Sequence, residues 1–181
     1  MDTKTLLVTG GAGFIGTNFI RYVLEEMENW RVVNLDVLTY AGNLANFQDL
    51  APSLAERHRF IHGDIRDKAL LDNLFAEETF DFVVHFAAES HVDRSILGPE
   101  AFLQTNVEGT FRLLEASLKG WDKLGKPDSF RFLHISTDEV YGSLGTKGYF
   151  IENTPYDPSS PYSASKAASD HFVRAYFPYL K

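Results

Sequence analysis

The chain has 181 residues, a formal net charge of −8 and no cysteine. Its length is sufficient for one domain with a substantial core, and its 44% hydrophobic and 23% charged residues are ordinary for a globular protein. The lack of cysteine excludes disulfides and thiolate metal sites and suits the cytoplasm. The acidic balance argues against nucleic acid as a partner, because phosphate binding needs clustered basic residues.

Two further kinds of site are not expected. No apolar run approaches the roughly 20 residues needed to span a bilayer, so we expect no membrane insertion. The histidines are scattered without metal-type spacing, so we expect no metal site. They are His58, His62, His85, His91, His134 and His171.

Apolar β-type runs alternate with helical patterns along the chain. The predicted strands occupy residues 6–8, 31–35, 59–62, 82–86 and 130–135. The predicted helices occupy residues 14–27, 67–77 and 99–119, and a last helix begins at Pro161 and is expected to end at Pro178. This alternation implies parallel strands joined by right-handed crossovers. We therefore predict an α/β fold of the Rossmann type, a doubly wound parallel sheet that binds ligands beyond the carboxyl ends of its strands, over residues 1–181.

A glycine-rich segment, Thr-Gly-Gly-Ala-Gly-Phe-Ile-Gly at residues 9–16, lies between the first predicted strand and the first predicted helix. Gly11, Gly13 and Gly16 fit the spacing G-x-G-x-x-G, and Gly10 opens the related G-x-x-G-x-x-G. The first glycines permit a tight turn, Gly13 lets the backbone approach a pyrophosphate, and Gly16 lets helix and strand pack closely. By itself, the pattern fits an ordinary tight turn equally well.

Asp36 ends the second predicted strand, where a carboxylate can accept hydrogen bonds from the adenosine ribose. It would repel the 2′-phosphate of NADP, so the segment predicts a dinucleotide site that favours NAD. Gly63, Asp64 and Ile65 follow the third strand, where they could contact the adenine, and Asp64 could equally serve as a turn or capping residue. Ala87 and Ala88 follow the fourth strand and either leave room for the cofactor or belong to a packed turn.

Ser-Pro-Tyr-Ser-Ala-Ser-Lys at residues 160–166 has the form of a helix start, with Ser160 as the cap. Tyr162 and Lys166 then lie on one helical face. A nearby ammonium and the positive nicotinamide ring would both lower the pKa of the tyrosine, which suits a base for hydride transfer between alcohol and ketone. The lysine can also hold the nicotinamide ribose. The alternative is an exposed surface pair.

Thr137, Asp138 and Glu139 follow the fifth predicted strand. The two acids form either a polar turn or, beside a hydride-transfer site, a proton donor and a proton acceptor. Adjacent carboxylates in a partly dry crevice can share a proton, and the sequence leaves open which of them holds it.

Together these motifs resemble the extended short-chain dehydrogenases and, within them, the dTDP-glucose 4,6-dehydratases. The matching segments are residues 9–16, 38–43, 87–95, 136–142 and 160–167. The acid pair after Thr137 is the most specific, because the epimerase relatives usually carry small or apolar residues there. The resemblance implies NAD as the cofactor and dTDP-glucose as the nucleotide-sugar substrate, which becomes dTDP-4-keto-6-deoxyglucose.

The resemblance also implies a role for each matching residue. Tyr162, with Thr137 and Lys166, would take the proton of the sugar 4-hydroxyl while the C4 hydride passes to NAD. Glu139 would remove the C5 proton, and Asp138 would protonate the departing 6-hydroxyl. Ser90 would face the hexose. The implied cofactor contacts are Gly10, Gly13, Phe14, Ile15, Gly16, Asp36, Leu38, Thr39, Asp64, Ile65, Ala87, Ala88, Thr105, Tyr162 and Lys166.

The resembling enzymes are nearly twice as long, and their second half grips the nucleotide diphosphate. We therefore expect the C-terminal substrate domain to be missing from residues 1–181. Full-length relatives commonly dimerise through helices that correspond to residues 99–119 and 161–177, which predicts a homodimer. Two alternatives stay open. A nucleotide-sugar 4-epimerase would have no use for Asp138 and Glu139, and a cofactor-binding module would have no turnover.

Overall fold

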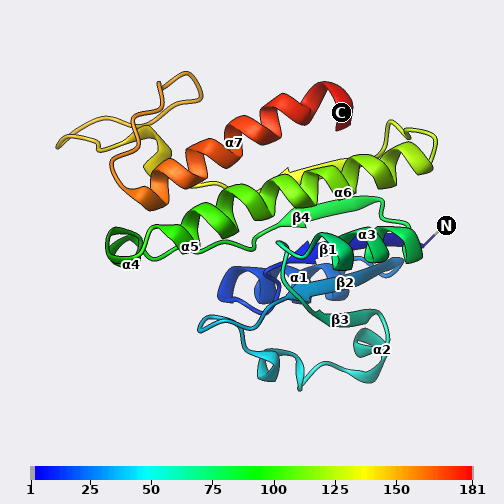
Figure 1. Cartoon of the computed structure of the whole chain (residues 1–181). Helices are drawn as coiled ribbons and strands as arrows, with labels where there is room; N and C mark the ends of the chain where they lie inside the picture. Colours follow the sequence, from blue (N-terminus) through cyan, green and yellow to red (C-terminus); the bar gives the residue numbers. More distant parts are fainter. Residues whose placement is uncertain (1–2, 181) are drawn as a thin grey trace.

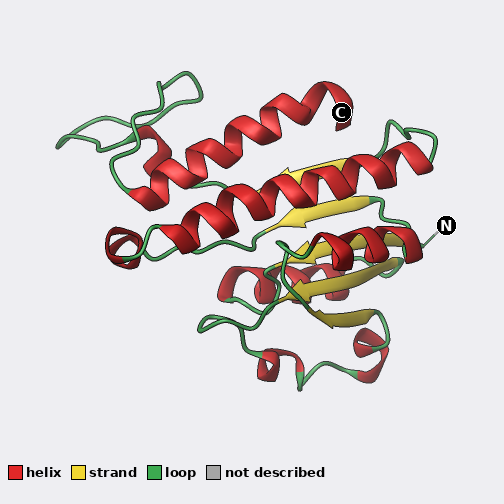
Figure 2. Ribbon diagram, in the orientation of Figure 1, coloured by secondary structure: helices red, strands yellow, loops and turns green. Residues whose placement is uncertain are grey.

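Five parallel strands form a sheet in the computed structural model, which describes residues 3–180 (Figure 1 and Figure 2). The spatial order of the strands is β3-β2-β1-β4-β5, so the direction of winding reverses between β1 and β4. This order confirms the predicted doubly wound sheet. The strands are β1 (Lys4–Thr9), β2 (Trp30–Asp36), β3 (His58–His62), β4 (Phe82–His85) and β5 (Arg131–His134).

Helices cover both faces of the sheet, because alternate side chains of β1 enter two different cores. Leu6 and Val8 pack with Ile20 on the face that α1 covers. Leu7 packs on the opposite face with Leu74 and other side chains of α3 and α6. The longer helices are α1 (Phe14–Glu26), α3 (Lys68–Glu77), α6 (Thr110–Lys123) and α7 (Pro161–Leu180), and α7 lies alongside α6 (Figure 1).

Five segments differ from the predicted elements. Four short ones were not predicted, because one or two turns carry too little periodicity to detect. They are η1 (Leu44–Phe47), α2 (Pro52–Ala55), α4 (Val92–Leu97) and η3 (Asp138–Tyr141). The fifth is the helix predicted for residues 99–119, which consists of α5 (Glu100–Phe102), the π-helical segment η2 (Leu103–Gly109) and α6.

This long helix was predicted to end before Gly120, but it continues to Lys123. Gly120 is retained inside the helix because a β-carbon at this position would lie only 2.7 Å from a ring carbon of Phe75 on α3. The glycine therefore serves close packing between two helices and not helix termination.

Helix α7 begins as predicted and ends later than predicted. The Ser163 amide donates to the Ser160 hydroxyl at 3.0 Å, and the Ser160 amide donates to the Ser163 hydroxyl at 3.0 Å, so Ser160 is the helix cap. The helix continues through Pro178 to Leu180.

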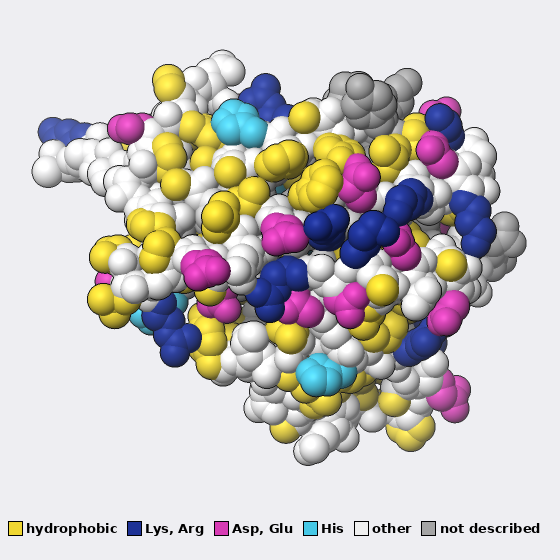
Figure 3. All heavy atoms as spheres, in the orientation of Figure 1, with side chains coloured by type: hydrophobic (Ala, Val, Ile, Leu, Met, Phe, Trp, Pro, Cys, Tyr) yellow, Lys and Arg dark blue, Asp and Glu magenta, His cyan; other side chains and the backbone are white. Residues whose placement is uncertain are grey.

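Charges of both signs alternate on the face that Figure 3 shows. On α3, the partly exposed Asp72 carboxylate accepts hydrogen bonds from Lys119 at 2.8 Å and from Lys68 at 2.5 Å. These two ammonium groups lower the pKa of Asp72 to about 2. Among the described residues, no helix combines the length and apolar character that crossing a membrane requires.

Candidate active site

A cleft of about 480 Å³ lies at the carboxyl ends of the strands. Its walls come from segments that are far apart in the sequence, among them the glycine loop after β1, the loops after β2, β3 and β4, and the first turns of α7. The cleft thus lies where the fold predicts a ligand. Most of the predicted contact residues line it: Gly10, Gly13, Phe14, Ile15, Gly16, Asp36, Thr39, Asp64, Ile65, Ala87, Ala88, Ser90, Thr105, Tyr162 and Lys166.

The glycine loop holds its turn by close backbone contacts. Gly10 has a φ of 70°, and a β-carbon there would lie 2.5 Å from the Ala87 nitrogen. A β-carbon on Gly16 would lie 2.3 Å from the Gly10 oxygen. A β-carbon on Gly13 would meet only the Gly10 oxygen, at 3.4 Å, and would otherwise enter the open cleft.

The amino end of α1 faces this cleft from Gly13 onwards. Its first turn contains no acidic residue, and no side chain caps it within the described part of the chain. The first N–H groups of a helix have no partner inside the helix, and they carry the positive end of its dipole. This end of the cleft therefore suits a phosphate anion.

Asp36 closes the next part of the cleft and is itself 8% exposed. One carboxylate oxygen accepts the Ala12 amide at 2.9 Å, and the other accepts the Leu38 amide at 2.8 Å. The carboxylate thus connects the glycine loop to the loop after β2, and each oxygen keeps a lone pair for a ribose hydroxyl. The cleft therefore offers glycine backbone where a phosphate would lie and a carboxylate where a ribose would lie, and this combination fits a dinucleotide.

Leu38 is the one predicted cofactor contact that does not line the cleft, among residues that the structure describes. Its φ is 54°, a left-handed conformation that leucine seldom adopts. This conformation presents the Leu38 amide to Asp36 and sends the side chain towards Gly42. Leu38 therefore contributes to the shape of the loop through its backbone.

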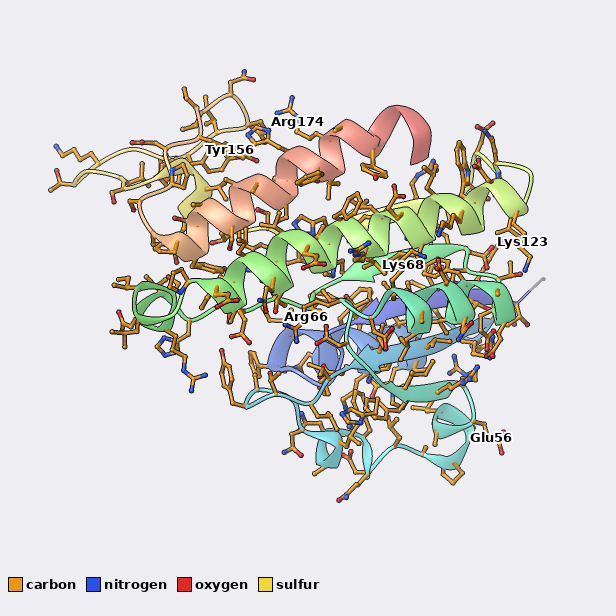
Figure 4. All side chains as sticks on the ribbon, viewed as in Figure 1. Glu56, Arg66, Lys68, Lys123, Tyr156 and Arg174 are labelled. Carbon is orange, nitrogen blue, oxygen red and sulfur yellow. The ribbon has the colours of Figure 1, made fainter. Side chains whose placement is uncertain are left out.

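Asp64 makes the turn that the sequence offered as one alternative, and it also lines the cleft, where its contact with adenine stays a prediction. Its carboxylate accepts the Arg66 amide at 2.8 Å and the Arg66 guanidinium at 2.6 Å. Burial raises the pKa of Asp64, but the hydrogen bonds from Arg66 outweigh it and bring the pKa below its ordinary value. Arg66 also donates to Gln104 at 3.0 Å, and Figure 4 shows it beneath the first turns of the long helix.

Tyr162 and Lys166 are buried, with exposed fractions of 9% and 4%, so they are not a surface pair. The Lys166 ammonium donates to the Ile135 carbonyl at 2.7 Å and lies 3.4 Å from the His134 ring nitrogen Nε2. Burial lowers the pKa of Lys166 to about 8.

The pKa of Tyr162 in the chain alone is raised, whereas the predicted lowering was to come from Lys166 together with the nicotinamide ring. Burial is the main cause, and the carboxylates of Glu139 and Asp138 raise it further, while a hydrogen bond with Thr137 opposes them. Lys166 does not supply the expected lowering, because its ammonium is directed at the Ile135 carbonyl.

The predicted acid pair lies beside Tyr162 but outside the cleft lining. Asp138 and Glu139 begin the short helix η3 (Asp138–Tyr141), and Thr137 caps it by accepting the Glu139 amide at 3.3 Å. Both carboxylates are exposed, so the prediction of a partly dry crevice is wrong for the described residues. The reason is that η3 follows β5, the edge strand of the sheet.

Asn106, within η2, was not predicted to belong to the site. It is 1% exposed and exchanges two hydrogen bonds with the backbone of Glu89, at 2.8 and 2.9 Å. Its amide also donates to Ser165 at 2.9 Å, so it connects a cleft wall to α7. Its sequence signal is a single polar residue within an amphipathic helix, which is weak, although π-helical segments often mark functional sites.

Gly63, next to Asp64, also lines the cleft, and ten further lining residues had received no predicted ligand contact. Their side chains are of mixed size and polarity and form no recognisable motif. They are Leu35, Val37, Ala41, Gly42, Arg66, Phe86, Glu89, Ala101, Ile135 and Ser136.

Comparison with known proteins places the chain in a family. The family model described as GDP-mannose 4,6 dehydratase matches residues 7–179. The chain belongs to this family. Within the GDP-mannose 4,6-dehydratase family, it is 61% identical over 175 residues to a dTDP-glucose 4,6-dehydratase of Xanthomonas campestris pv. campestris (strain B100). The resemblance predicted from the motifs is therefore confirmed.

Solved structures in this comparison share the fold of the chain. The dTDP-glucose 4,6-dehydratase DesIV of Streptomyces venezuelae, with NAD and TYD bound, has a TM-score of 0.83 and 48% identity. The match covers 96% of this chain and 52% of that one. A UDP-Glc/GlcNAc 4-epimerase of Campylobacter jejuni has a TM-score of 0.84 and 30% identity, with coverages of 98% and 51%. The Xanthomonas match covers 95% of this chain and 48% of the relative, so the chain spans about half the length of the curated relatives it matches.

Proposed function

We propose that the chain is the NAD-binding half of a dTDP-glucose 4,6-dehydratase, which forms dTDP-4-keto-6-deoxyglucose. The observation that carries this proposal is the position of two carboxylates, Asp138 and Glu139, which directly follow Thr137 at the start of η3 and whose charges raise the pKa of Tyr162. Removing water from a sugar after its oxidation needs one group to take a proton and another to give one. A 4-epimerase would use the tyrosine but not the two acids.

NAD is the proposed cofactor. Its pyrophosphate would lie against the glycine loop at Gly13, its adenosine ribose against Asp36, and its nicotinamide ribose against Lys166. The carboxylate of Asp36 favours NAD over NADP because it would repel a 2′-phosphate. The NAD-bound structure of the Streptomyces relative supports the same choice. Bound NAD would accept the hydride from C4 of the glucose and return it at C6.

The side chains of the protein would move the protons. Tyr162 would accept the proton of the 4-hydroxyl, and Thr137 would hydrogen-bond the 4-oxygen. The resulting 4-ketone makes the C5 proton acidic, and Glu139 would remove it. Asp138 would protonate the 6-hydroxyl, because a hydroxyl leaves readily only as water. Ser90, which lines the cleft, would face the hexose.

The fold does not separate the dehydratase from an epimerase, since the two TM-scores are 0.83 and 0.84. The sequence supports the dehydratase, because identity is 48% to the Streptomyces dehydratase and 30% to the Campylobacter epimerase. The exposed acids and the half-length match keep one further candidate open, a cofactor-binding module without turnover.

We also propose that the protein forms a homodimer through α6 and α7. The proposed location is the cytoplasm, where reducing conditions would not affect a chain without cysteine. Phe111 of α6 and Phe172 of α7 are in ring contact, with centroids 6.0 Å apart, and Phe172 is 39% exposed. Sedimentation velocity tests the dimer. A monomer at all concentrations up to about 100 µM would contradict it, since specific pairs associate at or below this range.

The purified chain should be incubated with NAD and dTDP-glucose in heavy water, and the mass of the sugar nucleotide should be measured. Loss of water together with one deuterium at C5 is the expected result. An unchanged mass with an altered sugar configuration would point to an epimerase. No reaction, with NAD bound, would point to a cofactor-binding module.

The Glu139→Gln variant provides the matched test of the acid pair. It keeps the size of the side chain and removes the base, so turnover should fall by about 100-fold or more. Asp157→Asn is a suitable control, because Asp157 is also exposed and outside the cleft lining. Full turnover in the Glu139→Gln variant would contradict the proposed role.

A further inference from the structure

A buried polar cluster lies behind Lys166, one helical turn further along α7. Its centre is Asp170, which is 9% exposed. One carboxylate oxygen of Asp170 accepts hydrogen bonds from the Ser136 hydroxyl at 2.6 Å and from the Tyr156 hydroxyl at 3.0 Å. Figure 4 shows Tyr156 where the loop before α7 meets the helix. A single carboxylate therefore ties together the end of β5, this loop and α7.

The other oxygen of Asp170 faces His134, the last residue of β5. The distance to the ring nitrogen Nε2 of His134 is 3.2 Å. The Ser169 hydroxyl lies 3.3 Å from the same nitrogen and donates its proton to the Lys166 carbonyl, at 2.8 Å. It therefore offers a lone pair to His134. Nε2 thus lies within 3.4 Å of two oxygen atoms and of the Lys166 ammonium, and among the described residues the Asp170 oxygen that faces it has no hydrogen-bond partner.

The charge of Asp170 acts on Lys166, whose ammonium is buried and lies 3.4 Å from the same ring nitrogen of His134. Burial lowers the pKa of Lys166, and the Asp170 carboxylate opposes this effect. Burial is also the main cause that lowers the pKa of His134. A neutral His134 leaves Asp170 as the carboxylate that favours the ammonium form of Lys166.

We propose that Asp170 is a positioning residue of the candidate active site, which keeps Lys166 in its ammonium form and holds the segment with Thr137 to Glu139 against the helix with Tyr162. Ser136 directly precedes Thr137, so its bond to Asp170 limits the movement of the acid pair relative to the phenol. The importance of Asp170 for turnover rests on the proposed function. Its effect on the charge of Lys166 does not.

Several other ionisable groups surround this cluster and contribute to its field. They come from β4, β5, η3, the loop before α7 and α7 itself. They are His85, His134, Asp138, Glu139, Tyr141, Tyr156, Tyr162, His171 and Arg174.

The test is a titration of the Lys166 side chain, followed through its ¹³Cε and ¹⁵Nζ resonances, which the Lys166→Arg variant assigns by their loss. The Asp170→Asn variant removes the charge and keeps the shape, so we expect the Lys166 midpoint to fall by about one pH unit. Tyr156→Phe is the matched control, because it removes one hydrogen bond to the same carboxylate and leaves the charge. Tyr156→Phe should leave the Lys166 midpoint unchanged. Asp170→Glu restores the negative charge, so its Lys166 midpoint should lie closer to the wild-type value than that of Asp170→Asn.

An unchanged Lys166 midpoint in a folded Asp170→Asn variant would overturn the proposal. If that variant does not fold, the wild type provides the test. The Lys166 resonances should then shift a second time at acid pH, together with the Asp170 carboxyl carbon, and no second shift would overturn the proposal. Neither readout requires NAD or sugar, so a failure of the proposed function would not be confused with a failure of this inference.

Discussion

Two alanine substitutions in the glycine loop should separate stability from cofactor binding. At Gly16, the new β-carbon would lie 2.3 Å from the Gly10 oxygen and 2.7 Å from the Gly11 α-carbon. Both atoms belong to the backbone, which cannot rotate away as a side chain can. At Gly13, the nearest atom is the Gly10 oxygen at 3.4 Å, which needs little or no adjustment, and the remaining space is the cleft.

The two costs follow from these distances. Gly16→Ala falls short of a 3.4 Å contact by 1.1 Å (3.4 − 2.3), so α1 has to move. Overpacking of this kind costs up to about 3 kcal/mol, and the better helix propensity of alanine returns about 1 kcal/mol, which leaves a loss of about 2 kcal/mol. Gly13 has a φ of −75°, which alanine adopts without strain. In Gly13→Ala, alanine is a poorer helix cap than glycine, which destabilises the folded chain by about 1 kcal/mol. Alanine also stiffens the unfolded chain, which stabilises the folded state by about the same amount. The stability of this variant should therefore stay within about 0.5 kcal/mol of the wild type.

Urea unfolding without cofactor measures the first effect, and calorimetric titration with NAD measures the second. The Gly16→Ala variant should lose stability, whereas the Gly13→Ala variant should stay stable and lose at least about tenfold in NAD affinity, a difference of 1.4 kcal/mol. A Gly16→Ala variant as stable as the wild type would refute the packing argument. Unchanged NAD affinity in the Gly13→Ala variant would refute the placement of the pyrophosphate.

Three further predictions concern stability. Asp36→Ala should lower the free energy of unfolding by about 2–3 kcal/mol, because the buried Ala12 amide loses its partner; a urea midpoint equal to that of the wild type would contradict this. His85 and His134 have pKa values below the ordinary 6.5 because they are buried, so the unfolded chain binds protons that the folded chain does not. The stability is therefore fully present above pH 6.5 and should fall as the pH decreases below it; equal urea midpoints at about pH 7.5 and 5.5 would argue against this linkage. Ser160→Ala should cost about 1 kcal/mol in thermal unfolding, since α7 loses its cap, and an unchanged melting temperature would show that the cap contributes nothing.

Much of the fold and of the cofactor site could be predicted from local sequence signals. The glycine spacing, Asp36 at a strand end and the Ser160-Pro161 helix start each depend on a few neighbouring residues, whose backbone preferences act over one turn. The strands were predictable because a buried parallel strand is a short apolar run. These signals also determined the family, because the motifs lie within segments of six to nine residues.

Other properties of the site were decided only by tertiary structure. The direction of the pKa shift at Tyr162 depends on burial and on Glu139, Asp138 and Thr137, which precede it by more than twenty positions. The exposure of the acid pair depends on the position of β5 at the sheet edge. The bond between Ser136 and Asp170 spans 34 positions. Burial, charge and hydrogen-bond partners depend on distances through space, which the fold sets and which a local pattern does not encode.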